Sequence, residues 1–374
     1  MQRKRSLFSL RGFFFLLAAL LLAIFSFSLG RTSRRPDFLP LPSKTLTDVC
    51  SWEADFRPLH LQEFLDVEIL GLSYPSLPRP LRVHATKRPG ASYAPYREFW
   101  LTVQEGSWEP TTFQVIKAAL TAGMGAGREV HLDIGSWVGP TALFAALLVP
   151  RVLAIEPDPR AFNELHANAL LNEALAPRLE LFRHCLASAT GPRTMTGPAP
   201  LGSSMSRVAG AARIPASASA EESWGERMVS FHSPCSTPLA FAARAGLRAS
   251  ELALIKLDVE GAEADILPAL VDWLEQEGGV KPPLLVELHA LFWADPAAGA
   301  RAAAGAMAKY AFAFASEVER PGRRVLDNVL AAYRPGTLLA ETGSLCPQAQ
   351  SFCMVLLVDE PLPWVQDLLV AARD

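Results

Sequence analysis

The sequence predicts an α/β fold with a doubly wound, mostly parallel sheet, because short apolar segments alternate with helical ones. Glu129–Leu132 is short, mostly apolar and followed by a turn signal, as expected of a buried strand. Thr141–Val149 is apolar enough to be a helix packed on a sheet, and Val152–Glu156 is predicted to be the next strand. With the glycine turn over residues 135–139, these segments form the opening of a nucleotide-binding βαβ unit.

The glycine turn favours one class of nucleotide ligand. A dinucleotide fingerprint packs three glycines as GxGxxG so that backbone can touch a pyrophosphate. Here only Gly135 and Gly139 follow Asp133, with bulky Trp137 between them, which fits a nucleoside that has no phosphates to bind. Glu156 ends the second strand 23 residues after Asp133, near the offset of about 20 at which an acidic side chain can bond ribose hydroxyls. The alternative is a generic α/β turn followed by a chance acidic residue.

Composition bounds the function. The 374 residues are half hydrophobic and one fifth charged, with a formal net charge of −3. Because the chain has no basic excess, a nucleic-acid partner is not expected. The length allows one large domain with additions, or two domains.

The N-terminus is expected to anchor the chain in a membrane. Basic residues precede an uncharged run from Gly12 to Gly30, which approaches the length of about 20 residues needed to cross a bilayer. We expect a retained single-pass anchor with a lumenal body in the Golgi or ER; a cleaved signal peptide is the alternative. The predicted organisation is a tail and anchor over 1–35, a stem or linker over 36–80, and a folded domain over 81–374.

The rest of the chain continues the alternation. Strands are predicted at Leu81–His84 and Phe99–Gln104 as a hairpin, and at Arg178–Phe182, Met228–His232, Leu252–Leu257, Leu284–His289, Thr337–Ala340 and Phe352–Val358. Helices are predicted at Thr111–Ala122, Ala161–Glu173, Pro238–Ala245, Asp265–Glu277, Pro296–Ser316 and Arg324–Tyr333. Thr190–Ala220, rich in Gly, Pro, Ser and Ala, is predicted to be a mobile loop or lid near a substrate.

Two of the predicted strands end in charged side chains at alternate positions. Lys256, Asp258 and Glu260 follow one strand, and Glu287 and His289 end the next. Alternate residues of an extended strand share a face, and ligands of an open parallel sheet bind beyond the carboxyl ends of its strands. Several acids and a histidine at neighbouring strand ends are costly to place without partners or a function. We therefore expect a functional cluster there.

Five segments, in this order, resemble the FkbM-type methyltransferases, which use S-adenosylmethionine. They are Asp133–Gly139, Ile155–Asp158, Gly202–Ser204, Ile255–Glu263 and Val286–His289, and Gly106–Pro110 is similar to the lead-in of that family. The likeness covers about residues 80–290, with a core at about 106–290. It departs from the family at Ser136-Trp137, where smaller residues are common, and at Thr237–Leu239, which replaces the usual Leu-Asp.

The resemblance implies a Rossmann-like class I methyltransferase fold. It also implies transfer of a methyl group from S-adenosyl-L-methionine to a hydroxyl of a sugar, a glycan or another small molecule. The residues expected to bind the cofactor are Asp133, Gly135, Gly139, Glu156 and, after the third strand, Ser188.

The charged cluster is expected to carry the chemistry. A hydroxyl is a poor nucleophile until its proton leaves, so a nearby base should help. His289 is the candidate base by intrinsic pKa, while Asp258, Glu260 and Glu287 could serve as the base or orient the imidazole. We expect no metal; a divalent cation held by the acidic group is the alternative.

Two other functions remain open. A membrane-anchored glycosyltransferase could use Asp258-Val-Glu260 as a metal site, but it gives no role to Asp133–Gly139 with Glu156. A catalytically inactive, ligand-binding relative is the other. The five cysteines allow disulfides in a lumenal body, with at least one thiol left over. Cys346 and Cys353 are the only near pair in sequence, and Cys185 is expected to be a small buried apolar residue.

Overall fold

The computed structural model describes residues 64–69, 80–85, 96–198, 201–208, 228–316, 330–333 and 352–371. These belong to one compact unit, Leu61–Asp374. The expected anchor at Gly12–Gly30 lies outside the described residues. Within the described ranges, no helix is long and apolar enough to cross a membrane.

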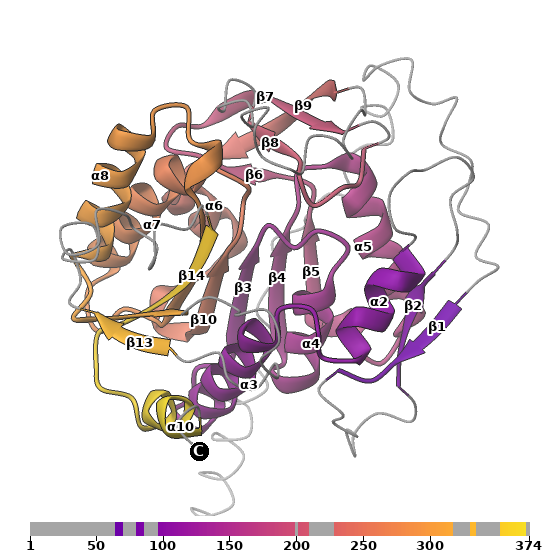
Figure 1. The fold of residues 1–374 in the computed structure, drawn as a ribbon, viewed down its shortest axis with the longest axis horizontal. Helices are drawn as coiled ribbons and strands as arrows, with labels where there is room; N and C mark the ends of the chain where they lie inside the picture. Colours follow the sequence, from indigo (N-terminus) through magenta and orange to yellow (C-terminus); the bar gives the residue numbers. More distant parts are fainter. Residues whose placement is uncertain are drawn as a thin grey trace, which may run out of the picture. The chain divides into compact units, whose positions relative to one another are not determined.

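An eight-stranded sheet forms the centre of the unit, in the order β13-β12-β14-β11-β10-β3-β4-β5 (Figure 1). Its parallel strands are β3 (Val130–Ile134), β4 (Arg151–Ile155), β5 (Leu179–Phe182), β10 (Leu252–Leu257) and β11 (Leu284–His289). Antiparallel strands β14 (Phe352–Val358), β12 (Phe312–Ser316) and β13 (Leu330–Tyr333) extend it. The predicted α/β class and mostly parallel sheet are confirmed.

Helices cover both faces of this sheet, because successive strand residues point to opposite sides. In β4, Leu153 and Ile155 pack with one buried cluster while Val152 and Ala154 pack with the other. The first cluster includes residues of α6 (Pro238–Ala245), α7 (Glu263–Glu277) and α8 (Pro296–Met307); the second includes residues of α3 (Pro110–Gly125), α4 (Pro140–Leu148), α5 (Pro159–Leu171) and α10 (Pro363–Ala371).

A second, four-stranded sheet lies beyond the carboxyl ends of β3, β4 and β5 (Figure 1). It contains β6 (Cys185–Leu186), β9 (Met228–Ser236), β7 (Gly191–Pro198) and β8 (Arg207–Val208). The prediction of a loop across Thr190–Ala220 is therefore wrong at β7 and β8. Eight register pairs hold β7 to β9, and residues of β9 alternate between exposed and buried. Gly202, between β7 and β8, thereby comes within hydrogen-bond distance of Trp137 in the turn after β3.

A disulfide joins two neighbouring strands of this second sheet, β6 and β9. Cys185 and Cys235 lie opposite each other in the β6–β9 register and form a disulfide. Cys185 is buried as expected, but it is a half-cystine and not merely a small apolar residue. Cys353 is also disulfide-bonded.

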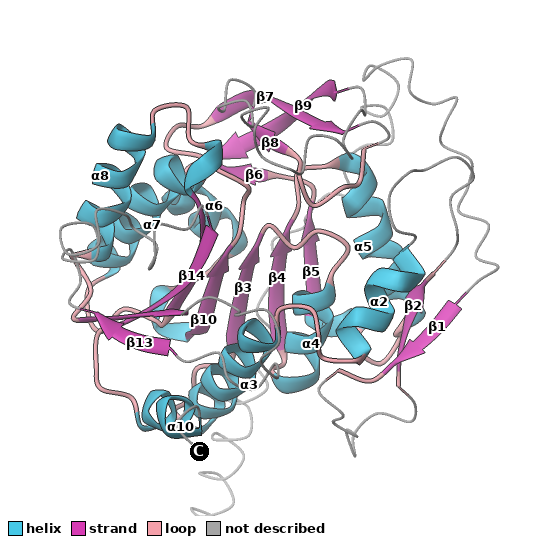
Figure 2. Ribbon diagram, viewed as in Figure 1, coloured by secondary structure: helices cyan, strands magenta, loops and turns pink. Residues whose placement is uncertain are grey.

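Three predicted elements differ from the structure (Figure 2). Phe99–Gln104 belongs to helix α2 (Tyr96–Gln104), not to a strand, and β2 (Leu81–His84) pairs instead with β1 (Phe64–Val67), inside the segment assigned to the stem. The Pro296–Ser316 helix ends at Met307 and is followed by β12. The end of the predicted Arg324–Tyr333 helix is strand β13; its earlier residues, and the predicted strand Thr337–Ala340, lie outside the described ranges.

Candidate active site

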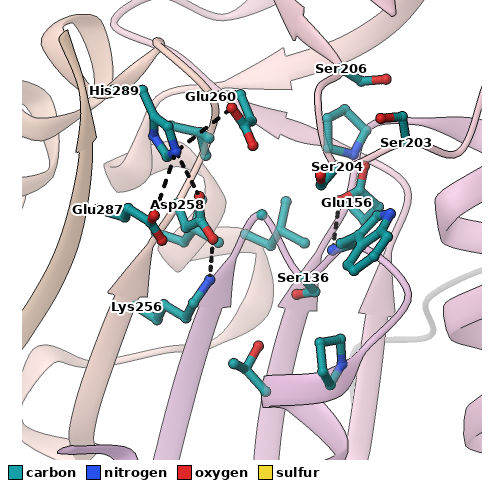
Figure 3. A pocket seen from close by; sticks show the side chains of 18 of the residues that line it. Ser136, Glu156, Ser203, Ser204, Ser206, Lys256, Asp258, Glu260, Glu287 and His289 are labelled. Atoms are coloured by element: carbon teal, nitrogen blue, oxygen red, sulfur yellow. Dashed lines mark hydrogen bonds and ion pairs between the residues drawn. The ribbon is translucent and has the colours of Figure 1, made fainter. Parts of the chain in front are cut away.

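A cavity of about 560 Å³ opens at the carboxyl ends of β3, β4, β10 and β11. Figure 3 shows two groups of polar side chains on opposite walls of it. Glu156, the turn after β3 and several serines form one wall, called here the cofactor wall. Lys256, Asp258, Glu260, Glu287 and His289 form the other, called the acceptor wall.

The glycine turn is shaped more by protein contacts than by the cavity. Gly135 lines the cavity with φ +83°, and a Cβ there would overlap the carbonyl oxygen of Asp258. Gly139 has φ +96° but does not line the cavity; a Cβ there would lie 2.6 Å from Leu165 Cδ1 of α5. Gly139 therefore allows α4 and α5 to pack closely, and its role in cofactor binding stays a prediction.

Asp133 and Ser188 also lie away from the cavity surface. Asp133 is fully buried within β3, and its Oδ2 accepts a hydrogen bond of 2.7 Å from Thr141 Oγ1 at the start of α4. Ser188 is exposed, and both its N–H and its hydroxyl donate to Asp265 on α7. Neither side chain is placed to touch a ligand in this cavity. Asp133 supports the turn from beneath, and Ser188 ties the second sheet to α7.

Glu156 is the ionisable group at the centre of the cofactor wall. Its Oε2 accepts from the N–H of Trp137 and its Oε1 from the N–H of Asp158, each at 2.8 Å. Trp137 adopts φ +47°, which directs its N–H at the carboxylate. Burial and the nearby charge of Asp158 raise the pKa of Glu156 to about 8, against the opposing effect of the two N–H donors.

On the acceptor wall, carboxylates surround one imidazole. His289 Nε2 lies 3.6 Å from Glu260 Oε2, 3.8 Å from Glu287 Oε1 and 3.9 Å from Asp258 Oδ1. Its Nδ1 lies 2.8 Å from Glu263 Oε1. Lys256 Nζ donates to Asp258 Oδ2 at 2.7 Å. The structure thus brings together all four residues expected to carry the chemistry.

The electrostatics of this cluster change the role expected of His289. Burial opposes its charged form, yet the carboxylates of Glu260 and Glu263 raise the pKa of His289 well above its usual range. Burial also raises the pKa of Glu260 to about 8 and that of Glu287 to about 7. For Asp258, burial is outweighed by Lys256 and His289, which lower its pKa. The raised pKa favours the protonated form of His289 at neutral pH, and Glu260 and Glu287 are the groups of this cluster that titrate near it.

The pattern of a known protein family matches this same part of the chain. The sequence pattern of the methyltransferase FkbM domain matches residues 125–298, from just before β3 to the start of α8. Residues 125–298 of the chain therefore carry a methyltransferase FkbM domain. The chain is accordingly an S-adenosylmethionine-dependent methyltransferase, which confirms the prediction made from the motifs. No curated protein sequence matches the chain.

Solved structures show weaker likenesses to this methyltransferase. An O-methyltransferase from Bacillus cereus in complex with SAH is 13% identical, with 67% of this chain and 81% of that chain covered and a TM-score of 0.34. Methyltransferase FkbM from Methylobacillus flagellatus is 14% identical, with 52% and 43% covered and a TM-score of 0.29. The O-methyltransferase TomG from Streptomyces achromogenes is 12% identical, with 71% and 86% covered and a TM-score of 0.35. At such low scores these likenesses add no argument.

Two carboxylates beside the acceptor wall of this methyltransferase were not among the predicted site residues: Glu109, which lines the cavity, and Glu263, which lies behind it. Glu109 precedes Pro110 at the start of α3 with φ +41°, and its buried Oε2 has no partner among the described residues. Burial and the charges of Glu287 and Asp258 raise the pKa of Glu109 well above its usual range. Glu263 is fully buried and bonds both His289 and Trp293 Nε1. Glu109 lies in the Gly106–Pro110 lead-in, which was a signal for it.

Ligand atoms for a cation also occur on this wall. Within the described residues, one set comprises Asp258, Glu260 and His289, and a second comprises Glu109, Asp258 and Glu287, with the atoms of each set within 4.8 Å of one another. The Lys256 ammonium and the protonated His289 already supply positive charge to the same carboxylates.

Proposed function

We propose that this methyltransferase methylates a hydroxyl oxygen of a sugar, a glycan or another small molecule. The observation that carries the proposal is one cavity with a nucleoside-binding carboxylate, Glu156, on one wall and titrating carboxylates on the other. When bound, S-adenosylmethionine supplies an electrophilic methyl group. The acceptor wall has the groups needed to take the proton of a hydroxyl.

Glu156 fits the role of binding the ribose hydroxyls. In its ionised form, which added hydroxyl donors favour over the protonated one, the Glu156 carboxylate offers about four acceptor positions, and two backbone N–H groups occupy one on each oxygen. Positions remain for two hydroxyl donors. Gly135 leaves the floor of the cavity without a side chain, while Asp133 and Gly139 fix the turn from outside the cavity.

On the acceptor wall we propose that a carboxylate, and not His289, takes the proton of the acceptor hydroxyl. Glu287 titrates nearest to neutral pH, where a general base is most effective, and Glu260 is the second candidate. Glu263 holds the His289 ring through Nδ1, so that Nε2 faces the three carboxylates. His289 then orients the acceptor and stabilises negative charge, and the Lys256–Asp258 pair supports it.

Titration calorimetry of the protein with S-adenosylmethionine, S-adenosylhomocysteine and UDP-sugars tests this function. We expect binding of the first two and none of the UDP-sugars. Transfer of labelled methyl groups to a panel of hydroxylated acceptors then tests the reaction. Binding of a UDP-sugar would favour the glycosyltransferase, and cofactor binding without turnover across a broad panel would favour the inactive relative.

We also propose that the Gly12–Gly30 run holds the protein in a membrane, with the body in the lumen of the Golgi or ER. The Cys185–Cys235 disulfide supports this because structural disulfides persist in oxidising compartments. Alkaline extraction of cell membranes should leave the protein in the pellet. Its complete release into the soluble fraction would contradict the anchor.

A further inference from the structure

One segment covers the cofactor wall. Leu201–Val208, called here the strap, follows β7 in the sequence and ends with β8. Ser203, Ser204 and Ser206 of the strap line the cavity, and Figure 3 shows them on the same side as Glu156. The strap therefore lies where it can contact the nucleoside part of the cofactor.

The backbone N–H and the backbone carbonyl of Gly202 both hold the strap in place by hydrogen bonds. Its N–H donates to Asp158 Oδ2 at 3.0 Å, and its carbonyl oxygen accepts from Tyr96 Oη and from Trp137 Nε1, each at 3.0 Å. Gly202 has φ +102°, and a Cβ there would lie 3.0 Å from both Arg160 Cγ and Tyr96 Oη. This position therefore requires glycine, because the backbone is left-handed and the surrounding side chains are close.

The residues that hold the strap also hold Glu156. Trp137 donates its backbone N–H to Glu156 and its indole N–H to Gly202. Asp158 donates its backbone N–H to Glu156 and accepts from Gly202 with its carboxylate. The orientation of Glu156 and the position of the strap consequently belong to one closed set of hydrogen bonds.

The carboxylate of Asp158 divides its two oxygens between two tasks. Oδ1 caps α5 by accepting from the N–H groups of Arg160 and Ala161, at 2.8 and 3.1 Å. Oδ2 accepts from Gly202 and from Ser206 Oγ, at 3.0 and 2.6 Å. Asp158 is fully buried, so water does not replace these bonds readily.

The strap reaches the acceptor wall as well. The Arg207 guanidinium lies over the Phe292 ring, 4.7 Å from its centroid, and the Phe292 ring stacks on the imidazole of His289. The strap thus contacts Asp158, which holds Glu156, and Phe292, which packs on His289 of the acceptor wall.

From these contacts we propose that Asp158 is a positioning residue for S-adenosylmethionine: it holds the strap over the nucleoside end of the cofactor while its backbone orients Glu156. This inference rests on the proposed cofactor wall. Asp158 touches no reacting atom in this scheme and acts through Gly202, Ser206 and Glu156.

The test is Asp158→Asn in the full chain. Asparagine caps a helix as well as aspartate does, so Oδ1 can still bond the start of α5, but the amide nitrogen cannot accept from Gly202 and Ser206. We expect the Kd for S-adenosylhomocysteine and the KM for S-adenosylmethionine to rise about tenfold, with kcat at saturating cofactor within about twofold of wild type. Asp295→Asn is the matched control, because Asp295 caps α8 by the same kind of bond to Ala298, outside the cavity; its Kd and KM should equal those of wild type.

The other possible results distinguish a wrong positioning role for Asp158 from a wrong proposed function. If Asp158→Asn binds S-adenosylhomocysteine as tightly as wild type while Glu156→Ala binds it weakly, the positioning role is wrong and the proposed function stands. If wild type itself fails to bind S-adenosylhomocysteine, the proposed function fails and this inference with it. Should Asp158→Asn not fold, Ser206→Ala takes its place, because it removes one strap bond and leaves the α5 cap intact. A three- to fivefold rise in Kd, roughly the value of one hydrogen bond, supports the role, and an unchanged Kd overturns it.

Discussion

The carboxylates beside the two walls of the cavity differ in how completely their oxygens are hydrogen-bonded. On the cofactor wall, both oxygens of Glu156 and both of Asp158 accept hydrogen bonds from the protein. On the acceptor wall, Glu109 and Glu260 each keep a buried oxygen that has no hydrogen-bond partner among the described residues. The filled hydrogen bonds of Glu156 fix its orientation for binding, whereas the unfilled oxygens on the acceptor wall can accept a hydrogen bond or a proton from an acceptor molecule. We infer from this difference that cofactor binding and proton removal belong to opposite walls of the cavity.

Among the variants of the acceptor wall, Glu287→Gln should cause the largest loss of activity. The substitution keeps the shape of the side chain but removes its ability to take a proton, and a positioned base is worth about 10²–10⁴-fold in rate. We expect kcat to fall within that range in a methyl-transfer assay, with the Kd for S-adenosylhomocysteine unchanged. Glu277→Gln, at an exposed position at the end of α7, is the control and should be fully active.

The pH profile of wild type identifies the group that titrates. Glu287 accepts a proton only when ionised, and burial raises its pKa to about 7. The value of kcat/KM should therefore rise about tenfold per pH unit below pH 7 and level off above it. Glu287→Gln should lose this limb; an unaltered limb in the variant would assign the proton to another carboxylate, with Glu260 next.

His289→Asn should have the next largest effect. The asparagine amide can still donate to Glu263, but the variant lacks the positive charge that faces the three carboxylates. Loss of a group that stabilises charge in a reaction costs about 10²–10³-fold in kcat. If His289 is only a satisfied core residue, activity should fall no further than the loss of folded protein, as measured by the thermal melting temperature.

The same comparison shows what the sequence could predict. The βαβ opening and the convergence of Asp258, Glu260, Glu287 and His289 follow from periodicity and from the position of strand ends. Helix α2 was predicted as a strand, because its aromatic and β-branched residues favour strands locally. Tertiary packing of Tyr96, Trp100 and Val103, spaced four and three apart, selects the helix.

The roles of single residues were harder to predict than their positions. Glycine spacing indicates that a side chain is excluded, but not whether a ligand or the protein excludes it; at Gly139 the excluding group is Leu165 of α5. Intrinsic pKa pointed to His289 as a base, yet Glu260 and Glu263 keep it protonated. Cys185 and Cys235 are 50 residues apart, and only the register of β6 and β9 brings them together.

Glu156→Ala tests the cofactor wall and should have a smaller effect. Removing the carboxylate leaves two ribose hydroxyls without acceptors, a loss of about 1–3 kcal/mol. The Kd for S-adenosylhomocysteine should rise about tenfold or more in titration calorimetry, with the protein still folded by circular dichroism. Glu180→Ala, a carboxylate on β5 bonded to Arg151 and outside the cavity, is the control. An unchanged Kd would remove Glu156 from the binding site.

Chelation should have the smallest effect, and it tests whether the acceptor wall is complete without a metal. The Lys256 ammonium lies 2.7 Å from Asp258, and the protonated His289 faces Glu260 and Glu287. Because these two side chains already offset the charge of the carboxylates, methyl transfer in EDTA should stay within about twofold of the untreated rate. Activity abolished by EDTA and restored by Mg²⁺ or Mn²⁺ would instead make Asp258, Glu260 and Glu287 ligands of a cation. The acceptor wall would then be a metal centre, and the base proposed at Glu287 would be withdrawn.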